Sequence, residues 1–221
     1  MKPAISTPFA IPVALARHPD AGRLNPLLRE LFVDRENQSG QYANERATMQ
    51  AVSGLFESRF DLFRWPESCV RELREFCWGQ LFHVIADVNQ ISPTELRQVR
   101  GHADAWFHIT RRGGYFPLHN HPMASWSGVY CVDPGQKGGS DSCGGMLSFP
   151  DPNGAAAMFK DAANQRLRLP FSHSTREYQL EAGQLIIFPS WLMHQVTPFL
   201  GNGERITVAF NAWFTPTGHV D

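Results

Sequence analysis

The chain has 221 residues, with 20 Lys and Arg against 21 Asp and Glu and a formal net charge of -1. This balance argues against a nucleic-acid partner, because proteins that bind nucleic acids usually carry a basic stripe and this sequence has none. The hydrophobic content of 43%, which includes 16 Phe and 6 Trp, argues against disorder. At roughly 100–200 residues per domain, the length fits one large domain or two small ones.

The four cysteines form no CxxC pair and do not have the spacing of a zinc knuckle. We therefore expect reduced thiols. The apolar residues near the N-terminus are interrupted by prolines, and no apolar run approaches the roughly 20 residues that span a bilayer. The sequence predicts a cytoplasmic protein without membrane association.

Two helices are expected in the first hundred residues. Residues 20–34 carry leucines at three- and four-residue spacing, and a clearer helix over residues 66–88 begins with a proline suited to a first helical turn. Before and between them, residues 5–13 predict an edge strand and residues 35–60 are polar and rich in turns. The apolar stripe of the second helix, which we expect to pack against a sheet, consists of Val70, Leu73, Cys77, Leu81, Val84 and Val88.

After Gly101 the pattern changes to short strands separated by glycine and proline, of which the chain has 18 and 16. The expected strands cover residues 103–112, 115–121, 126–132, 146–149, 166–170, 176–181, 184–189 and 205–214. We predict a mainly β fold with N-terminal helices: a double-stranded β-helix (jelly roll) backed by α-helices. Residues 1–221 would form a single domain, in which residues 1–100 support a core formed by residues 101–221.

The segment Gly-Gly-Tyr-Phe-Pro-Leu-His-Asn-His-Pro carries two histidines, His119 and His121. Alternate side chains of a strand point to one face, so both imidazoles could bind the same metal ion. Taken alone, this pair is about as well explained by two histidines that line a polar pocket by chance.

A third histidine follows the apolar strand that ends at Pro189. His194 lies some seventy residues beyond the first pair, in the arrangement that a metal site in a jelly roll requires. Two adjacent ligands and one distant ligand occupy one face of an octahedron and leave positions open for other ligands. Three imidazoles suit iron, zinc, copper or nickel, so the ligand types alone do not select the metal.

The strand Arg-Ile-Thr-Val-Ala-Phe-Asn alternates between polar and apolar residues. Arg205, Thr207 and Asn211 share one face, which we expect to line the mouth of the barrel beside the histidines. A guanidinium there could bind a carboxylate through two hydrogen bonds, and Thr207 could add a hydroxyl donor. The alternative is a surface arginine that pairs with Glu204.

From about Trp106 to Phe214, the sequence resembles the iron(II)/2-oxoglutarate-dependent oxygenase superfamily, and within it a little-characterised bacterial group. The resemblance rests on the combination of GGYFPLHNHP, WSGVYCV, GGMLSFPDP, FPSWLMH and RITVAFN. In this superfamily an HxD or HxE pair and a distal histidine bind the metal, and a later Arg or Lys binds the far carboxylate of 2-oxoglutarate. The resemblance therefore implies that His119 and His194 are metal ligands, with Arg205 as the cosubstrate anchor and Thr207 as its partner.

The sequence departs from the family pattern at His121, which stands where the superfamily has a carboxylate. Asp151, in the Phe-Pro-Asp-Pro turn, is the alternative carboxylate ligand, but the three-histidine set already has the required spacing. Further candidates to contact the cosubstrate are Tyr115, Tyr130 and Asn211. The resemblance implies oxidation, usually hydroxylation, of a small-molecule or peptide substrate, with iron(II) as the metal and decarboxylation of 2-oxoglutarate to succinate.

Two other functions remain open at this point. A cupin-type metalloenzyme, such as a cofactor-free dioxygenase or an isomerase, would also use three histidines, but Ser125 and Trp126 stand where its motif has a glutamate. In the oxygenase, Arg205 would bind the cosubstrate, whereas the cupin gives this residue no role. A non-catalytic metal-binding sensor domain is the third option. Exposed strand edges and the N-terminal helices could build a homodimer.

Overall fold

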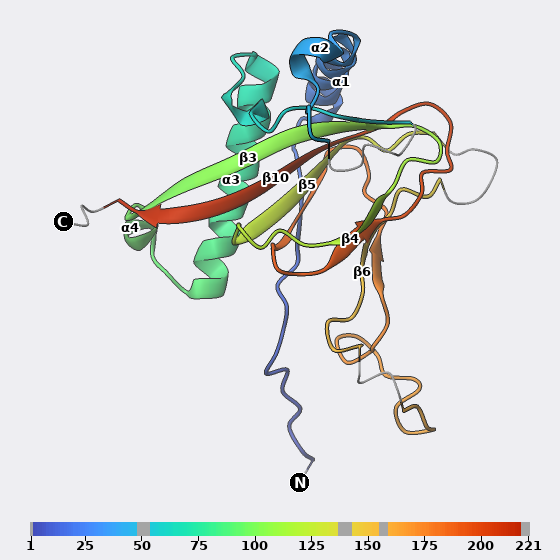
Figure 1. The fold of residues 1–221 in the computed structure, drawn as a ribbon. Coiled ribbons are helices and arrows are strands. Elements are labelled where there is room, and N and C mark those ends of the chain that lie inside the picture. Colours follow the sequence, from blue (N-terminus) through green and yellow to red (C-terminus); the bar gives the residue numbers. More distant parts are fainter. Residues whose placement is uncertain (1, 48–53, 137–142, 155–158, 218–221) are drawn as a thin grey trace.

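The computed structural model describes residues 2–47, 54–136, 143–154 and 159–217. Two antiparallel sheets face each other, and helices cover the outer face of the larger sheet (Figure 1). The helices are α1 (Ala21–Asn37), α2 (Ser39–Tyr42), α3 (Ser68–Asn89), α4 (Pro93–Leu96) and the 3-10 helix η1 (Leu62–Arg64). Across these ranges, no helix is long and apolar enough to cross a membrane.

The larger sheet has six strands and the smaller sheet has four. In spatial order, the larger sheet consists of β1 (Ala14–Arg17), β8 (Gln184–Pro189), β5 (Trp126–Asp133), β10 (Arg205–Pro216), β3 (Val99–Thr110) and β2 (Leu55–Glu57). The smaller sheet consists of β4 (Phe116–His119), β9 (His194–Val196), β6 (Leu147–Phe149) and β7 (Arg176–Tyr178). The eight strands from β3 to β10 are divided equally between the two sheets, as in a double-sheet jelly roll. The predicted mainly β fold with N-terminal helices is confirmed.

The central strand β10 separates the helical core from the space between the sheets. Ile206, Val208 and Phe210 are buried in the core beneath the helices, as the alternation predicts. Arg205 and Thr207 are also buried, but they line a pocket between the sheets. Because side chains alternate along a strand, one face of β10 packs in the helical core and the other lines the pocket.

Aromatic side chains join the helices to the larger sheet. The rings of Phe32 on α1 and Phe107 on β3 stack 4.2 Å apart between centroids, and both side chains are fully buried. On α3 the predicted stripe is buried up to Leu81, but in the last turn Ile85 is buried and Val88 is exposed. Near the C-terminal end of the helix, the buried position is therefore Ile85, one residue after the predicted Val84.

Some predicted strands differ from the structure. Residues 5–13 form no strand, and the edge strand β1 begins only at Ala14, since the prolines that precede it cannot donate to a ladder. Residues 166–170 alternate in polarity but have no strand to pair with among the described residues. Strands β2 and β9 were not expected. Both have three residues, and β2 lies in the segment that the sequence indicates to be polar and rich in turns.

The Phe32 and Phe107 stack predicts a measurable contribution to stability. Phe32→Ala should lower the free energy of unfolding by about 3–5 kcal/mol, because it removes a fully buried ring and leaves a cavity. Urea denaturation followed by tryptophan fluorescence measures the change. Leu27→Ala, on an exposed position of the same helix, is the control and should change stability little. A loss below about 1 kcal/mol in Phe32→Ala would contradict the assignment of this stack to the core.

Candidate metal centre and anion pocket

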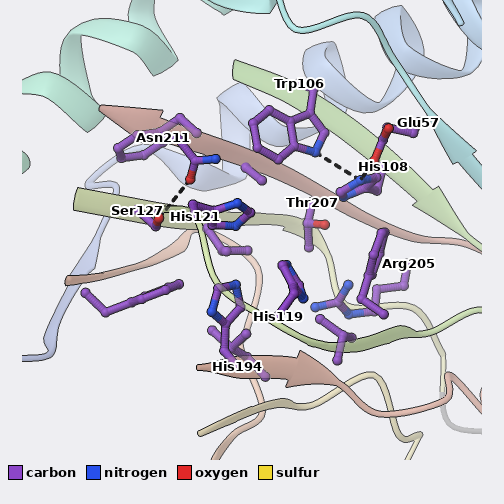
Figure 2. A pocket seen from close by; sticks show the side chains of 18 residues that line it. Glu57, Trp106, His108, His119, His121, Ser127, His194, Arg205, Thr207 and Asn211 are labelled. Carbon is purple, nitrogen blue, oxygen red and sulfur yellow. Dashed lines mark hydrogen bonds and ion pairs between the residues drawn. The ribbon is translucent and has the colours of Figure 1, made fainter. Parts of the chain in front are cut away.

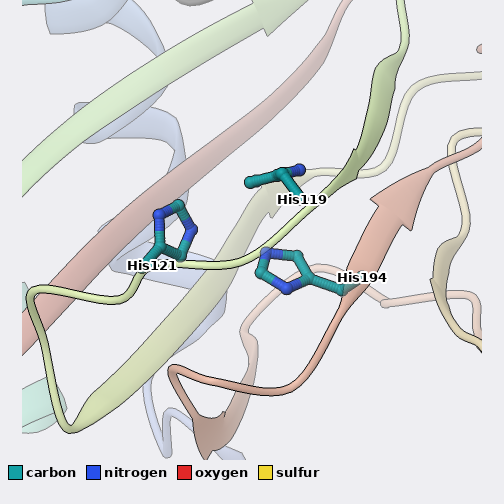
Figure 3. Close-up of side chains that lie close together, drawn as sticks. All are labelled: His119, His121 and His194. Atoms are coloured by element: carbon teal, nitrogen blue, oxygen red, sulfur yellow. The ribbon is translucent and has the colours of Figure 1, made fainter. Parts of the chain in front are cut away.

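Three histidine side chains converge between the sheets (Figure 3). One ligand atom each from His119, His121 and His194 lie within 4.8 Å of one another. The ring centroids of His119 and His194 are 4.3 Å apart, and these two residues are direct cross-strand partners on β4 and β9. The structure therefore brings together the three histidines that the sequence singles out.

Backbone carbonyls orient two of the three rings. Nδ1 of His119 lies 2.7 Å from the carbonyl oxygen of Pro117, and Nδ1 of His194 lies 2.8 Å from that of Leu192. A carbonyl oxygen only accepts, so the hydrogen of each ring is on Nδ1 and the lone pair is on Nε2. This tautomer is the one in which Nε2 can bind a metal, and such a carbonyl contact is typical of metal-bound histidines.

His121 reaches the centre from a turn. The expected strand over residues 115–121 ends at His119, and its pairing with β9 is irregular between Phe116 and His119. The backbone N–H of His121 donates to the carbonyl of Ser190 over 2.9 Å, which ties this turn to the turn before β9. Long-range hydrogen bonding, and not strand alternation alone, places His121 beside His119.

Two of the three ligands, His121 and His194, are neutral at ordinary pH. Burial, together with the nearby His119, lowers the pKa of His194 to about 3 and that of His121 to about 4. Neutral imidazole is the form that binds metal ions. The donor set and its tautomers therefore fit a divalent transition metal such as iron, zinc, nickel or copper.

Arg205 is buried in the same pocket and has no anionic partner among the described residues. Its side chain is 3% exposed, and burial lowers the pKa of its guanidinium, which nevertheless stays charged. The alternative partner, Glu204, instead receives hydrogen bonds from Arg29 over 2.8 Å and from Arg111 over 2.7 Å. A buried, unpaired cation is costly, so this position fits an anionic ligand.

Small and hydroxylated residues surround the Arg205 side chain. A Cβ at Gly145 would lie 2.7 Å from Cδ of Arg205, so only glycine leaves room for the arginine stem. Thr110 is the cross-strand partner of Arg205, and its buried Oγ1 has no hydrogen-bond partner in the described part of the chain. The guanidinium and this orphaned hydroxyl are chemically suited to a carboxylate.

A single pocket contains both the histidines and Arg205 (Figure 2). Along β10, Arg205 and Asn211 are six residues apart, which is roughly 20 Å in a strand, so they mark opposite ends of the pocket. Besides apolar residues, the pocket is lined by Trp106 and by polar side chains. The polar side chains are those of Glu57, His108, His119, His121, Ser127, His194, Arg205, Thr207 and Asn211.

Three of the predicted site residues lie elsewhere. Tyr130 is on the opposite face of β5, where its hydroxyl donates to Oδ1 of Asn25 over 2.7 Å beneath the helices. Tyr115 is 38% exposed and is not among the residues that line the pocket. Asp151 pairs with His173 over 3.2 Å in a separate groove. The three histidines therefore converge without a contribution from Asp151.

Sequence reasoning missed a buried polar group in the pocket. His108 and Trp106 share a face of β3, and period 2 along residues 103–112 could have placed them together. Glu57 gave no signal, because it lies in a turn-rich segment and reaches the pocket only through the pairing of β2 with β3. The contacts of this group are described below.

Residues 104–211 match a sequence-family model described as "Putative 2OG-Fe(II) oxygenase". This segment begins in β3, ends in β10 and contains the three histidines, Arg205 and Thr207. No curated protein matches the sequence.

Solved structures share the fold at low sequence identity. The chain is similar to a prolyl-4-hydroxylase from Pseudomonas putida, with a TM-score of 0.58, 15% identity and 94% of each chain covered. It is also similar to a Trichoplax adhaerens prolyl hydroxylase, with a TM-score of 0.56 and 12% identity over 91% of this chain and 83% of the other. HygX from Streptomyces hygroscopicus, solved with nickel and 2-oxoglutarate bound, has a TM-score of 0.52 and 12% identity over 94% and 84% of the two chains.

The family match agrees with the pocket. Residues 104–211, slightly less than half of the chain, are similar to a family whose description names iron(II) and 2-oxoglutarate. The resemblance predicted from the sequence motifs is confirmed.

Metal titration tests the histidine centre. His194→Ala should weaken the binding of a probe ion such as Co(II) by more than about 100-fold, because it removes a buried ligand. The visible absorption of Co(II) reports on binding. His173→Ala, whose ring pairs with Asp151 outside the pocket, is the control. Equal Co(II) affinity in wild type and His194→Ala would contradict the assignment.

Proposed function

We propose that this protein oxidises a small-molecule or peptide substrate in a reaction that depends on iron(II) and 2-oxoglutarate. His119, His121 and His194 would hold the metal, and Arg205 would hold the far carboxylate of 2-oxoglutarate. When bound, iron(II), 2-oxoglutarate and oxygen supply an oxidant that can hydroxylate a C–H bond, with succinate and carbon dioxide as the other products. The observation that carries the proposal is the buried guanidinium of Arg205, which lies in the pocket of the three histidines and has no anionic partner among the described residues.

The chain's own residues would bind, orient and shield the reactants. Nδ1 of His119 and of His194 donates to a backbone carbonyl, so each ring is already aimed before a metal arrives. Arg205 would fix one end of the cosubstrate and Thr207, two residues along β10, would donate a hydroxyl hydrogen. Phe188 and Leu147 add apolar surface to the pocket walls and would exclude water from the metal.

The end of the pocket away from Arg205 would receive the substrate. Asn211 lies at that end, and its Oδ1 accepts a hydrogen bond from Ser127 over 2.7 Å. Ser127 in turn lies 2.8 Å from Oγ of the buried Ser190. Because Oδ1 is engaged by the protein, the amide N–H groups of Asn211 are the donors available to a substrate oxygen. We propose Asn211 as a substrate contact, in place of its predicted role toward the cosubstrate.

Arg205 favours the oxygenase over a cupin-type enzyme. A three-histidine metal centre alone would serve either class. A cofactor-free reaction has no use for a buried cation, which costs several kcal/mol when it has no partner. The closed environment of Arg205 suits a ligand that reaches it with a carboxylate.

Cosubstrate binding tests the proposal directly. Under anaerobic conditions, wild-type protein with iron(II) and 2-oxoglutarate should show a metal-to-ligand charge-transfer band, and Arg205→Ala should need at least about tenfold more 2-oxoglutarate to develop it. Arg176→Ala, outside the pocket, is the control and should behave as wild type. No band in wild-type protein with iron demonstrably bound would refute the cosubstrate assignment and leave the metal centre intact.

Gly145 gives a second test at the anchor. Gly145→Ala places a methyl group against Arg205 at a position whose backbone φ is +64°, so the arginine must shift. We expect weaker 2-oxoglutarate binding with unchanged metal affinity, both measured by calorimetry. Gly22→Ala, where an added Cβ meets nothing within 4 Å, is the control. If Gly145→Ala bound 2-oxoglutarate as tightly as wild type, the anchor would lie elsewhere.

A further inference from the structure

A row of polar side chains crosses the wall of the pocket on three neighbouring strands. Glu57 on β2 is the cross-strand partner of His108 on β3, and His108 is the partner of Thr207 on β10. All three residues are less than 9% exposed. Burial of polar groups is unfavourable unless each finds a partner, so the row requires an explanation. Neither the metal centre nor the Arg205 anchor accounts for His108.

The protein engages one nitrogen of the His108 ring twice. Nε1 of Trp106 donates to Nε2 of His108 over 3.0 Å, and Oε2 of Glu57 lies 3.0 Å from the same Nε2 (Figure 2). The ring of Phe116 packs on the imidazole with 4.4 Å between centroids. These contacts fix the position and the plane of the ring from three sides.

The indole contact determines where the hydrogen of the ring is. An indole N–H can only donate, so Nε2 of His108 must present its lone pair. Burial lowers the pKa of His108, which favours the neutral ring with a single hydrogen. That hydrogen is then on Nδ1, and a hydrogen bond between Glu57 and Nε2 would require a hydrogen on the carboxyl group. Nδ1 itself has no hydrogen-bond partner among the residues that the structure describes.

We infer that His108 binds the cosubstrate, with Nδ1–H donating to an oxygen of the 2-oxo acid that bridges the three histidines and Arg205. This inference rests on the proposed function. Thr207, the cross-strand partner of His108, is two residues from Arg205 on β10. A ligand that joins the anchor to the metal passes this row. Trp106 and Glu57 are positioning residues, since they act through the His108 ring.

Two amide substitutions distinguish the roles of the two nitrogens of the His108 ring. In His108→Asn the amide group lies about where Nδ1 is, whereas in His108→Gln it reaches the place of Nε2. His108→Asn should bind 2-oxoglutarate within about threefold of wild type, and His108→Gln and His108→Leu at least about tenfold more weakly. Trp106→Phe removes the donor that fixes the ring hydrogen, and should also weaken binding. The measurement is calorimetry of 2-oxoglutarate binding to the Ni(II)-loaded protein, which requires no turnover.

The controls distinguish ligand binding from folding. His102→Leu alters another histidine of β3, one that contacts Thr215 and does not line the pocket, and should bind as wild type. Ni(II) affinity should be unchanged in every variant of His108. Wild-type affinity for 2-oxoglutarate in His108→Gln would overturn the inference, as would equal losses in the Asn and Gln variants. Absence of 2-oxoglutarate binding in Ni(II)-loaded wild type would refute the proposed function itself.

Discussion

The alternation of side chains along β10 is the constraint on which the site depends. This strand pairs with β3 on one side and β5 on the other, so the pairing fixes which side chains point to each face of the sheet. A slip of one residue would move Arg205 beneath the helices and bring Ile206 into the pocket. The packing of Val208 and Phe210 against the helices therefore also fixes the direction in which Arg205 and Thr207 point.

The buried polar and charged groups of the pocket lower the stability of the fold. Within the described part of the chain, Arg205 is buried without an anionic partner and the Thr110 hydroxyl without a hydrogen-bond partner, and Glu57 and His108 are buried polar residues. Aromatic packing beneath the helices, such as the Phe32 and Phe107 stack, offsets these costs. A buried cation without an anionic partner is expected where a ligand completes the structure. A bound anion would therefore stabilise the fold by binding only its native state.

The sequence predicted those parts of the site that depend on local spacing. His119 and His121 are two residues apart, and Arg205 and Thr207 alternate within one strand, so their relation is visible without the fold. Tyr130 was misplaced because an isolated apolar strand does not show which face meets the helices. Its register against Val208 decides that, and register depends on strand pairing distant in the sequence. Glu57 was invisible for the same reason, since only its pairing with His108 brings it to the pocket.

A crystal structure of the protein grown anaerobically with iron(II) and 2-oxoglutarate tests the central claim most directly. The account predicts a metal ion bound by three imidazole nitrogens, from His119, His121 and His194, and a ligand carboxylate on the Arg205 guanidinium. Iron bound through Asp151, or 2-oxoglutarate bound away from Arg205, would contradict it.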